Sequence, residues 1–96
     1  MYSVQTYDAG DRPEDRRVRP HSQFATAAAA VAAARVLIEE NLALSLTAGL
    51  SATAAYEEWR LHGEVPTIVA LGGAAPVQFD PLSFARARVQ ELQKRV

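Results

Sequence analysis

A histidine and a glutamate flank one glycine in residues 56–73, a stretch that also holds the only tryptophan of the chain. His62 and Glu64 stand two positions apart, and such a pair could bind a metal ion or move a proton. No third ligand is close in sequence, and His21 is the only other histidine. Alternatively, His62 belongs to the last turn of a helix and complements the helix dipole there. The missing ligands favour this alternative, and we expect no metal or cofactor.

Aromatic side chains at helical spacing surround this pair. They could form the wall of a small-molecule pocket near Trp59 and Gly63. More often, aromatic residues at this spacing belong to the core, and this chain has few other large apolar side chains to fill one. The candidate pocket comprises Tyr56, Trp59, His62, Glu64 and Phe84.

Basic residues cluster in the segment before the alanine-rich region. Basic groups beside exposed aromatic rings, such as those of Tyr2 and Tyr7, can hold phosphates and stack on bases. Acidic residues in the same segment offset this charge, and the net charge of the chain is −1. The candidate nucleic-acid contacts are Arg16, Arg17, Arg19 and His21.

No pattern in the chain favours catalysis. Ser22 follows His21, but neighbours in a strand point to opposite faces, so the pair does not predict a nucleophile with its base. The chain contains no cysteine, which excludes thiolate catalysis and thiolate metal sites. The segment GGAAP at 72–76 lacks the lysine and hydroxyl residue of a phosphate-binding loop. An enzyme is therefore less expected than a binding protein.

Neither a secretory signal nor a membrane span is recognisable in the sequence. The first ten residues lack a basic region followed by an apolar one. The run ATAAAAVAAARVLI is dominated by alanine, contains Arg35 and is followed by Glu39 and Glu40. We therefore expect a cytoplasmic protein without a membrane partner.

Segments with an apolar residue at every second position alternate along the chain with segments whose apolar residues recur every three or four positions. The first kind predicts strands and the second predicts helices. Strands are predicted at 2–7, 16–24 and 67–71, with a short strand at 77–79 as the alternative to a loop, and helices at 27–46, 52–62 and 81–95. Pro20 indicates an edge strand. The continuous apolar run 67–71 favours a strand that is central in its sheet or covered on both faces.

Local signals mark the ends of the predicted helices. Thr26, Ser51 and Asp80 are typical N-cap residues, because their side-chain oxygens can accept backbone N–H groups. Gly49 suits the left-handed conformation just past a helix end. Gly63 stands where the second helix ends before Pro66. The last helix is predicted to bury the stripe Leu82, Ala85, Val89, Leu92 and Val96.

The chain of 96 residues is expected to form a single domain, 1–96. The predicted order is β-β-α-α-β-(β)-α. This order indicates an α+β fold, a small two-layer sandwich with a three- to four-stranded, mainly antiparallel sheet and helices on one face.

Short motifs in residues 22–92 resemble those of a family of small uncharacterised bacterial proteins. The matching pieces are FAT (24–26), GLS (49–51), GEVPTI (63–68) and FDPLSFARARVQEL (79–92). The family pattern has acidic residues after the threonine, and an acidic and an aromatic residue around the proline. This chain has Ala27, Ala28, Val65 and Thr67 at those positions. The resemblance implies a shared fold and no activity, because no function is established for the family.

The composition favours an interaction module without catalytic activity. A small domain with few large core residues gains stability by burying surface against a second copy or another protein. Such burial could involve an edge strand or the apolar side of the helices, and a homodimer or protein partner is therefore expected. One alternative is a regulatory nucleic-acid-binding protein that uses the arginine-rich hairpin. Another is a small-molecule binder or weak hydrolase near Trp59 and Gly63.

Overall fold

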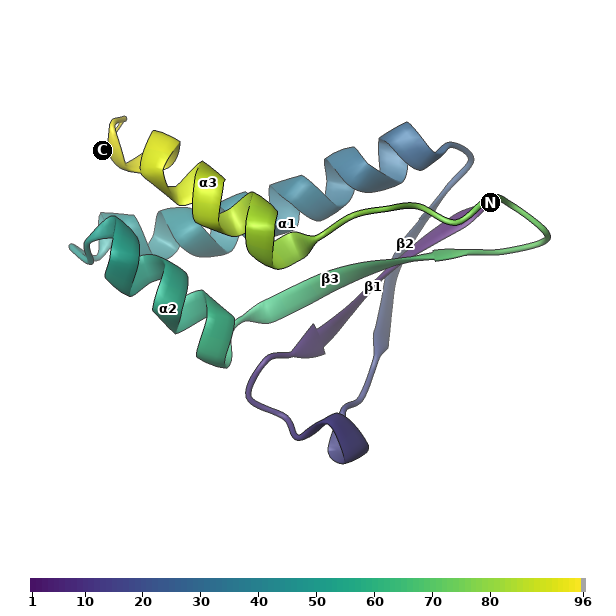
Figure 1. The fold of residues 1–96 in the computed structure, drawn as a ribbon, viewed down its shortest axis with the longest axis horizontal. Coiled ribbons are helices and arrows are strands. Elements are labelled where there is room, and N and C mark those ends of the chain that lie inside the picture. Colours follow the sequence, from purple (N-terminus) through teal and green to yellow (C-terminus); the bar gives the residue numbers. More distant parts are fainter. Residues whose placement is uncertain (96) are drawn as a thin grey trace.

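The computed structural model describes residues 1–95, which form a three-stranded antiparallel sheet with three helices on one side (Figure 1). The predicted α+β class, order of elements and one-sided helical layer are confirmed. The strands are β1 (Tyr2–Asp8), β2 (Arg19–Phe24) and β3 (Glu64–Ala70); the helices are α1 (Ala27–Thr47), α2 (Ala52–His62) and α3 (Pro81–Gln93). A short 3-10 turn, η1 (Pro13–Asp15), lies between β1 and β2.

The strand order is β2-β1-β3, so β1 occupies the centre of the sheet. In the register, Val4 lies opposite Ser22 on one side and Ile68 on the other, and a bulge follows Val4 in the pairing with β2. The expected edge position of the strand with Pro20 is confirmed. A central position for the apolar run 67–71 was wrong, because β3 pairs with β1 alone. Cover on both faces is not seen either, because Val69 is 37% exposed and its neighbours in the run are only half-buried. The buried residues of β3 are Val65 and Pro66, which precede the run and point to opposite faces.

The third strand begins at Glu64, three residues earlier than the sequence indicates. Gly63 has the extended dihedrals φ −83° and ψ 178°, so the chain leaves α2 directly as a strand. Its carbonyl accepts a hydrogen bond from the Ala9 N–H at 2.9 Å, which continues the ladder beyond Asp8. Residues 64–66, which precede the predicted strand, are therefore part of the sheet.

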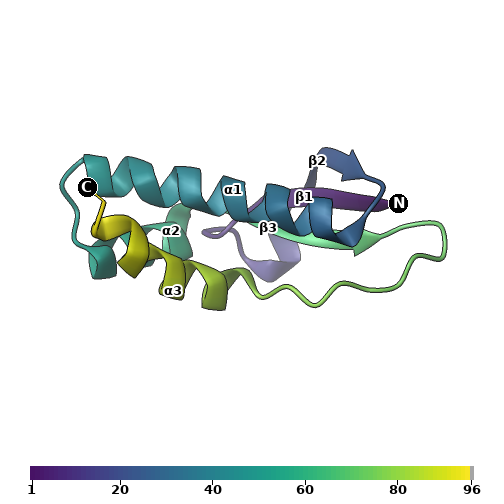
Figure 2. The ribbon, with the colours of Figure 1, turned by 90° about the horizontal axis from the view of Figure 1, so that it is seen from above.

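The short strand at 77–79 is not formed in the described residues. Residues 74–80 run without regular structure from the end of β3 back to α3 (Figure 2). Pro66 in β3 and Pro76 in this segment each lack the N–H that a ladder needs, which explains why the two do not pair.

All three predicted N-caps are confirmed. The hydroxyl of Thr26 accepts the Ala29 N–H at 3.2 Å, and that of Ser51 accepts the Ala54 N–H at 3.2 Å. One carboxylate oxygen of Asp80 accepts the backbone N–H groups of Leu82 and Ser83 at 3.1 and 3.2 Å. Gly49 has a φ of 98°, the left-handed conformation that favours glycine.

The core has two parts that share α1. The first half of this helix contacts the sheet and carries the fully buried Ala30 and Ala34, whose small side chains permit close approach. The second half extends beyond the sheet and packs on α2 and α3, which makes the molecule elongated, 43 × 30 × 18 Å (Figure 2). The buried residues of this second part are Ile38, Leu42, Leu46, Ala52, Ala55, Tyr56, Trp59, Val65, Ala85 and Val89.

The predicted inner stripe of the last helix needs one change. Ala85 and Val89 are buried and Leu92 packs against the core, as expected. Leu82 is instead 44% exposed, because the first turn of α3 buries Phe84 against the core in its place. Helix α3 ends at Gln93, and Val96 lies outside the described residues.

Gly63 is required by a close contact and not by its backbone conformation. A Cβ atom at this position would lie 2.6 Å from Cδ1 of Trp59 and 2.8 Å from the Trp59 carbonyl oxygen. The Trp59 ring packs over this backbone, and its N–H donates to the carbonyl of Glu64 at 3.0 Å. The tryptophan thus closes the junction between α2 and β3.

We expect Gly63→Ala to reduce the free energy of unfolding by about 1–3 kcal/mol, because the new methyl group displaces Trp59. The change should also alter the fluorescence of Trp59, the only tryptophan. Gly49→Ala is a matched control, since no atom lies within 4 Å of a Cβ there. It should cost about 1 kcal/mol through left-handed strain and leave the fluorescence unchanged. Urea unfolding followed by fluorescence and circular dichroism measures both effects, and equal spectra for the two variants would contradict the assignment.

The Asp80 cap should make α3 sensitive to acid. Hydrogen bonds from the Ser83 hydroxyl and from the N–H groups of Ser83 and Leu82 lower the pKa of the Asp80 carboxyl group. A lowered native pKa adds stability above the unfolded pKa of about 4, and this stability is lost as the pH falls through the native pKa. Asp80→Asn keeps a cap that cannot ionise. We expect this variant to lose less stability than the wild type below about pH 4 in urea unfolding; equal losses would argue against the cap.

Candidate functional site

The candidate nucleic-acid contacts lie on the β2 side of the sheet and in the segment before it. Arg19 reaches across the sheet end and pairs with Asp8 at 3.0 Å and Glu64 at 2.9 Å, one carboxylate on each of the other two strands. Hydrogen bonds from Asp8 and then Glu64 raise the pKa of Arg19. The guanidinium of Arg16 lies 4.0 Å from the centroid of the Tyr7 ring. Both arginines therefore already have partners within the chain, and no such contact is seen for Arg17 in residues 1–95.

His21 and Ser22 are joined by a hydrogen bond, Nδ1 to Oγ, at 3.1 Å. The expectation that these neighbours point apart was wrong. The pairing shifts here, with Ser22 opposite Val4 and Pro20 opposite Gln5, so His21 is the extra residue of the bulge. The pair is exposed, and in the described chain no carboxylate bonds to His21 to orient it as a base.

The five residues of the candidate pocket fall in four places. Trp59 and His62 line one hollow between α1 and α2, whereas the carboxylate of Glu64 is held by Arg19. Tyr56 lines a separate hollow between α2 and α3, with the Arg86 guanidinium 5.5 Å from its ring. Phe84 packs against Phe79, at 6.1 Å between centroids. Among residues 1–95, no group of three or more His, Asp or Glu side chains could hold a metal ion.

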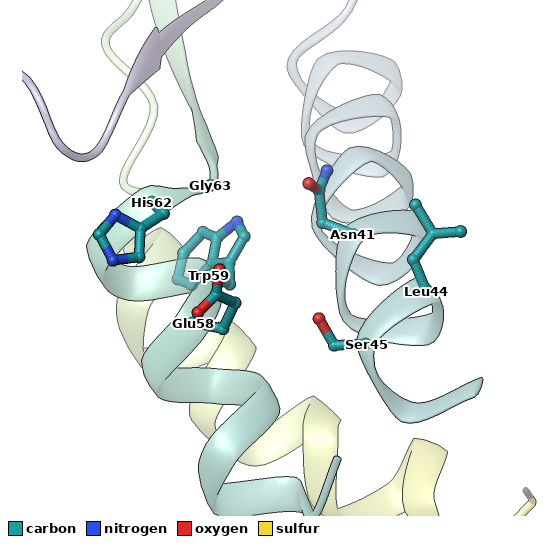
Figure 3. Close-up of a pocket in the computed structure, with 7 residues that line it drawn as sticks. All are labelled: Asn41, Leu44, Ser45, Glu58, Trp59, His62 and Gly63. Carbon is teal, nitrogen blue, oxygen red and sulfur yellow. The ribbon is translucent and has the colours of Figure 1, made fainter. Parts of the chain in front are cut away.

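The hollow between α1 and α2 has a volume of about 220 Å³ (Figure 3). It is lined by Asn41, Leu44, Ser45, Glu58, Trp59, His62 and Gly63. The sequence analysis missed the residues of α1 that line this hollow, although Asn41 and Ser45 are polar residues in a mainly apolar helix. The Asn41 amide donates to the Leu37 carbonyl of its own helix at 2.9 Å, and Trp59 is only 2% exposed. Trp59 therefore serves mainly as core, and the polar groups at the mouth are Ser45, Glu58 and His62.

A second feature that the sequence analysis missed is the solvent side of α1. Six residues spaced four apart are all exposed there: Ala28, Ala32, Val36, Glu40, Leu44 and Ala48. We call this row the outer stripe. Leu44 is 73% exposed and Val36 50% exposed. Around Leu44, the neighbouring Ala43, Thr47 and Ala48 form an open, largely apolar surface that Glu40 borders.

The signal for the outer stripe is present in the sequence. Residues 27–38 are apolar on every side of the helix except for Arg35, so one inner face cannot account for all of them. A helix that is apolar all round is usually covered all round. In this structure the sheet, α2 and α3 cover the inner side only (Figure 2).

Comparison of the chain with protein-family models, curated proteins and solved structures finds no match. The resemblance noted from FAT, GLS and GEVPTI therefore rests on those motifs alone. Within residues 1–95, no helix combines the length and the apolar character needed to cross a membrane.

Burial of Trp59 can be checked in solution. We expect acrylamide to quench the fluorescence of the native protein far less than that of the urea-unfolded chain, because the ring is covered by Gly63 and the core. A small molecule bound in the hollow should shift this emission only slightly. Quenching as strong in the native state as in urea would mean that the ring is open to solvent and could serve as a ligand platform.

Proposed function

We propose that this protein is a non-catalytic interaction module that associates with itself through the outer stripe of α1. The observation that carries the proposal is the exposure of Leu44, 73%, on an open apolar surface of the same helix. Large apolar side chains on monomeric proteins are usually scattered, whereas here Val36 and Leu44 stand in one exposed row of α1 together with three alanines and Glu40.

Burial of this face would favour association. Covering one leucine side chain contributes about 1.5–3 kcal/mol, and a symmetric contact covers two of them. The helix itself is already folded and packed on its inner side, so little further ordering opposes the contact. Association would thus cover the apolar side of α1 that the small core of this domain leaves exposed.

The sheet edges are less suited to association than α1. Strand β2 carries Pro20, a bulge and the paired Arg19, and strand β3 carries Pro66. Proline, bulges and charges are the features by which edge strands avoid pairing with another chain. The proposal therefore places the contact on the helical side.

The other functions have weaker support. For nucleic-acid binding, the positive charge of Arg19 is balanced by two carboxylates and Arg16 is stacked on Tyr7. For catalysis, no nucleophile is bonded to an oriented base in the described residues. We propose a cytoplasmic setting, because a fold without cysteine needs no oxidising compartment.

Leu44→Gln should weaken self-association by about tenfold or more, which corresponds to about 1.4 kcal/mol. The matched control is Leu82→Gln, which removes a leucine that is 44% exposed on α3, away from the outer stripe. Sedimentation velocity over a wide concentration range should give a wild-type mass that rises from 10.4 kDa towards twice that value. A wild type that stays at 10.4 kDa up to millimolar concentration would refute self-association.

A further inference from the structure

We propose that a hollow beside Tyr7 binds a small molecule that carries one carboxylate and an apolar body. The hollow lies where the end of β1, the start of β3 and the first turn of α3 meet the C-terminal part of α2 (Figure 1). We call it the Tyr7 hollow. Its volume is about 400 Å³, near the small end of the range for ligand pockets. Within the described chain no residue of α1 lines it, so this proposal goes beyond association through the outer stripe and does not rest on it.

The floor of the Tyr7 hollow is apolar and is held by secondary structure. Tyr7 and Val65 are directly paired across β1 and β3, so their side chains lie on the same face of the sheet, and both pack with the core. The first turn of α3 adds Pro81 and Leu82. Leu82 is 44% exposed although the sequence predicts it to face inward. An apolar ligand body in the hollow would cover this leucine, and that burial favours binding.

Arg16 supplies the cation for the carboxylate. Its guanidinium lies 4.0 Å from the centroid of the Tyr7 ring. Contact with a ring uses the flat face of the guanidinium and leaves the N–H groups at its edge able to donate. Within residues 1–95, Arg16 forms no ion pair and donates no side-chain hydrogen bond. A carboxylate is the matching acceptor, because its two oxygens fit two parallel N–H groups of one guanidinium.

The other charges at the Tyr7 hollow favour a carboxylate over a phosphate. Arg60 is already bound to Glu57 by two hydrogen bonds, at 3.2 and 2.6 Å. Asp80 also lines the hollow, and hydrogen bonds from Ser83 and from the backbone of the first turn of α3 lower the pKa of its carboxyl group, so it is ionised at neutral pH. Arg16 beside this fixed anion suits a ligand with a single negative charge, whereas Asp80 would repel a phosphate dianion.

Titration of the isotope-labelled protein with phenylacetate, followed by the amide NMR signals, tests the site. We expect saturable shifts at Ala9, Arg16, Val65 and Leu82, with a Kd of about 1 mM because the ligand is small and the hollow is open. Phenylacetamide has the same body without the charge and should bind about tenfold more weakly. The absence of saturable shifts at tens of millimolar phenylacetate, or shifts confined to other parts of the chain, would overturn the proposal.

Variants of two neighbouring arginines test the role of Arg16. Arg16→Gln should weaken phenylacetate binding by about tenfold or more, and Arg16→Lys, which keeps the charge without the paired N–H groups, should restore only part of it. Arg17→Gln is the matched control, since Arg17 is exposed and does not line the hollow. Thermal unfolding followed by circular dichroism verifies that the variants are folded. Equal affinity of the Arg16→Gln and Arg17→Gln variants would show that Arg16 does not hold the carboxylate.

The preference for a single negative charge can be tested at Asp80. Phenyl phosphate should bind the wild type more weakly than phenylacetate does. Asp80→Asn should narrow this difference by about threefold or more, because the neutral side chain still caps α3 but no longer repels the dianion. Tighter binding of phenyl phosphate than of phenylacetate to the wild type would overturn the assignment of the ligand class.

Ligand binding and self-association fail separately. Leu82→Gln should weaken phenylacetate binding because it removes part of the apolar floor, and it should leave sedimentation unchanged. Leu44→Gln should have the reverse pattern, since Leu44 does not line the Tyr7 hollow. Phenylacetate binding in a protein that stays monomeric would support the ligand site and refute self-association alone. Unchanged phenylacetate affinity in the Leu82→Gln variant would contradict the ligand site alone.

Discussion

The packing of Trp59 over the junction between α2 and β3 is the interaction on which the rest of the structure depends. The chain passes from helix to strand without a loop, and this passage is possible because Gly63 has no side chain where the indole lies. The indole N–H then binds the first carbonyl of β3. One side chain thus fixes the direction in which β3 leaves the helical layer, and β3 in turn provides one of the two ladders of the central strand.

Features that depend on neighbouring residues were predictable from the sequence. The N-caps Thr26, Ser51 and Asp80 act within one turn, and their hydrogen bonds are present as expected. In the last helix, the inward positions of Ala85, Val89 and Leu92 follow from periodicity, whereas Leu82 in its first turn is exposed. The class of the fold follows from the order of these elements.

Features that depend on distant residues were not predictable. Nothing near residues 67–71 indicates that β1 takes the centre of the sheet, because strand order is decided by pairings far apart in the chain. The candidate pocket failed to assemble for the same reason. Glu64 is turned to Arg19, 45 residues away in sequence, and the side chains that do face Trp59 come from α1. The bulge that brings His21 to Ser22 likewise arises from pairing with β1.

The bulge in the pairing of β2 has a consequence for the way in which the sheet opens. The Arg19 ion pairs tie all three strands at one end, but the ladder between β1 and β2 is interrupted by the bulge, whereas β1 and β3 pair without interruption from Tyr2 to Asp8. Local opening begins where fewer backbone bonds must break. We therefore expect the sheet to open by release of β2, with amide protons protected longest along the β1–β3 ladder, so that a peptide competing for the exposed side of β1 would enter through that gap.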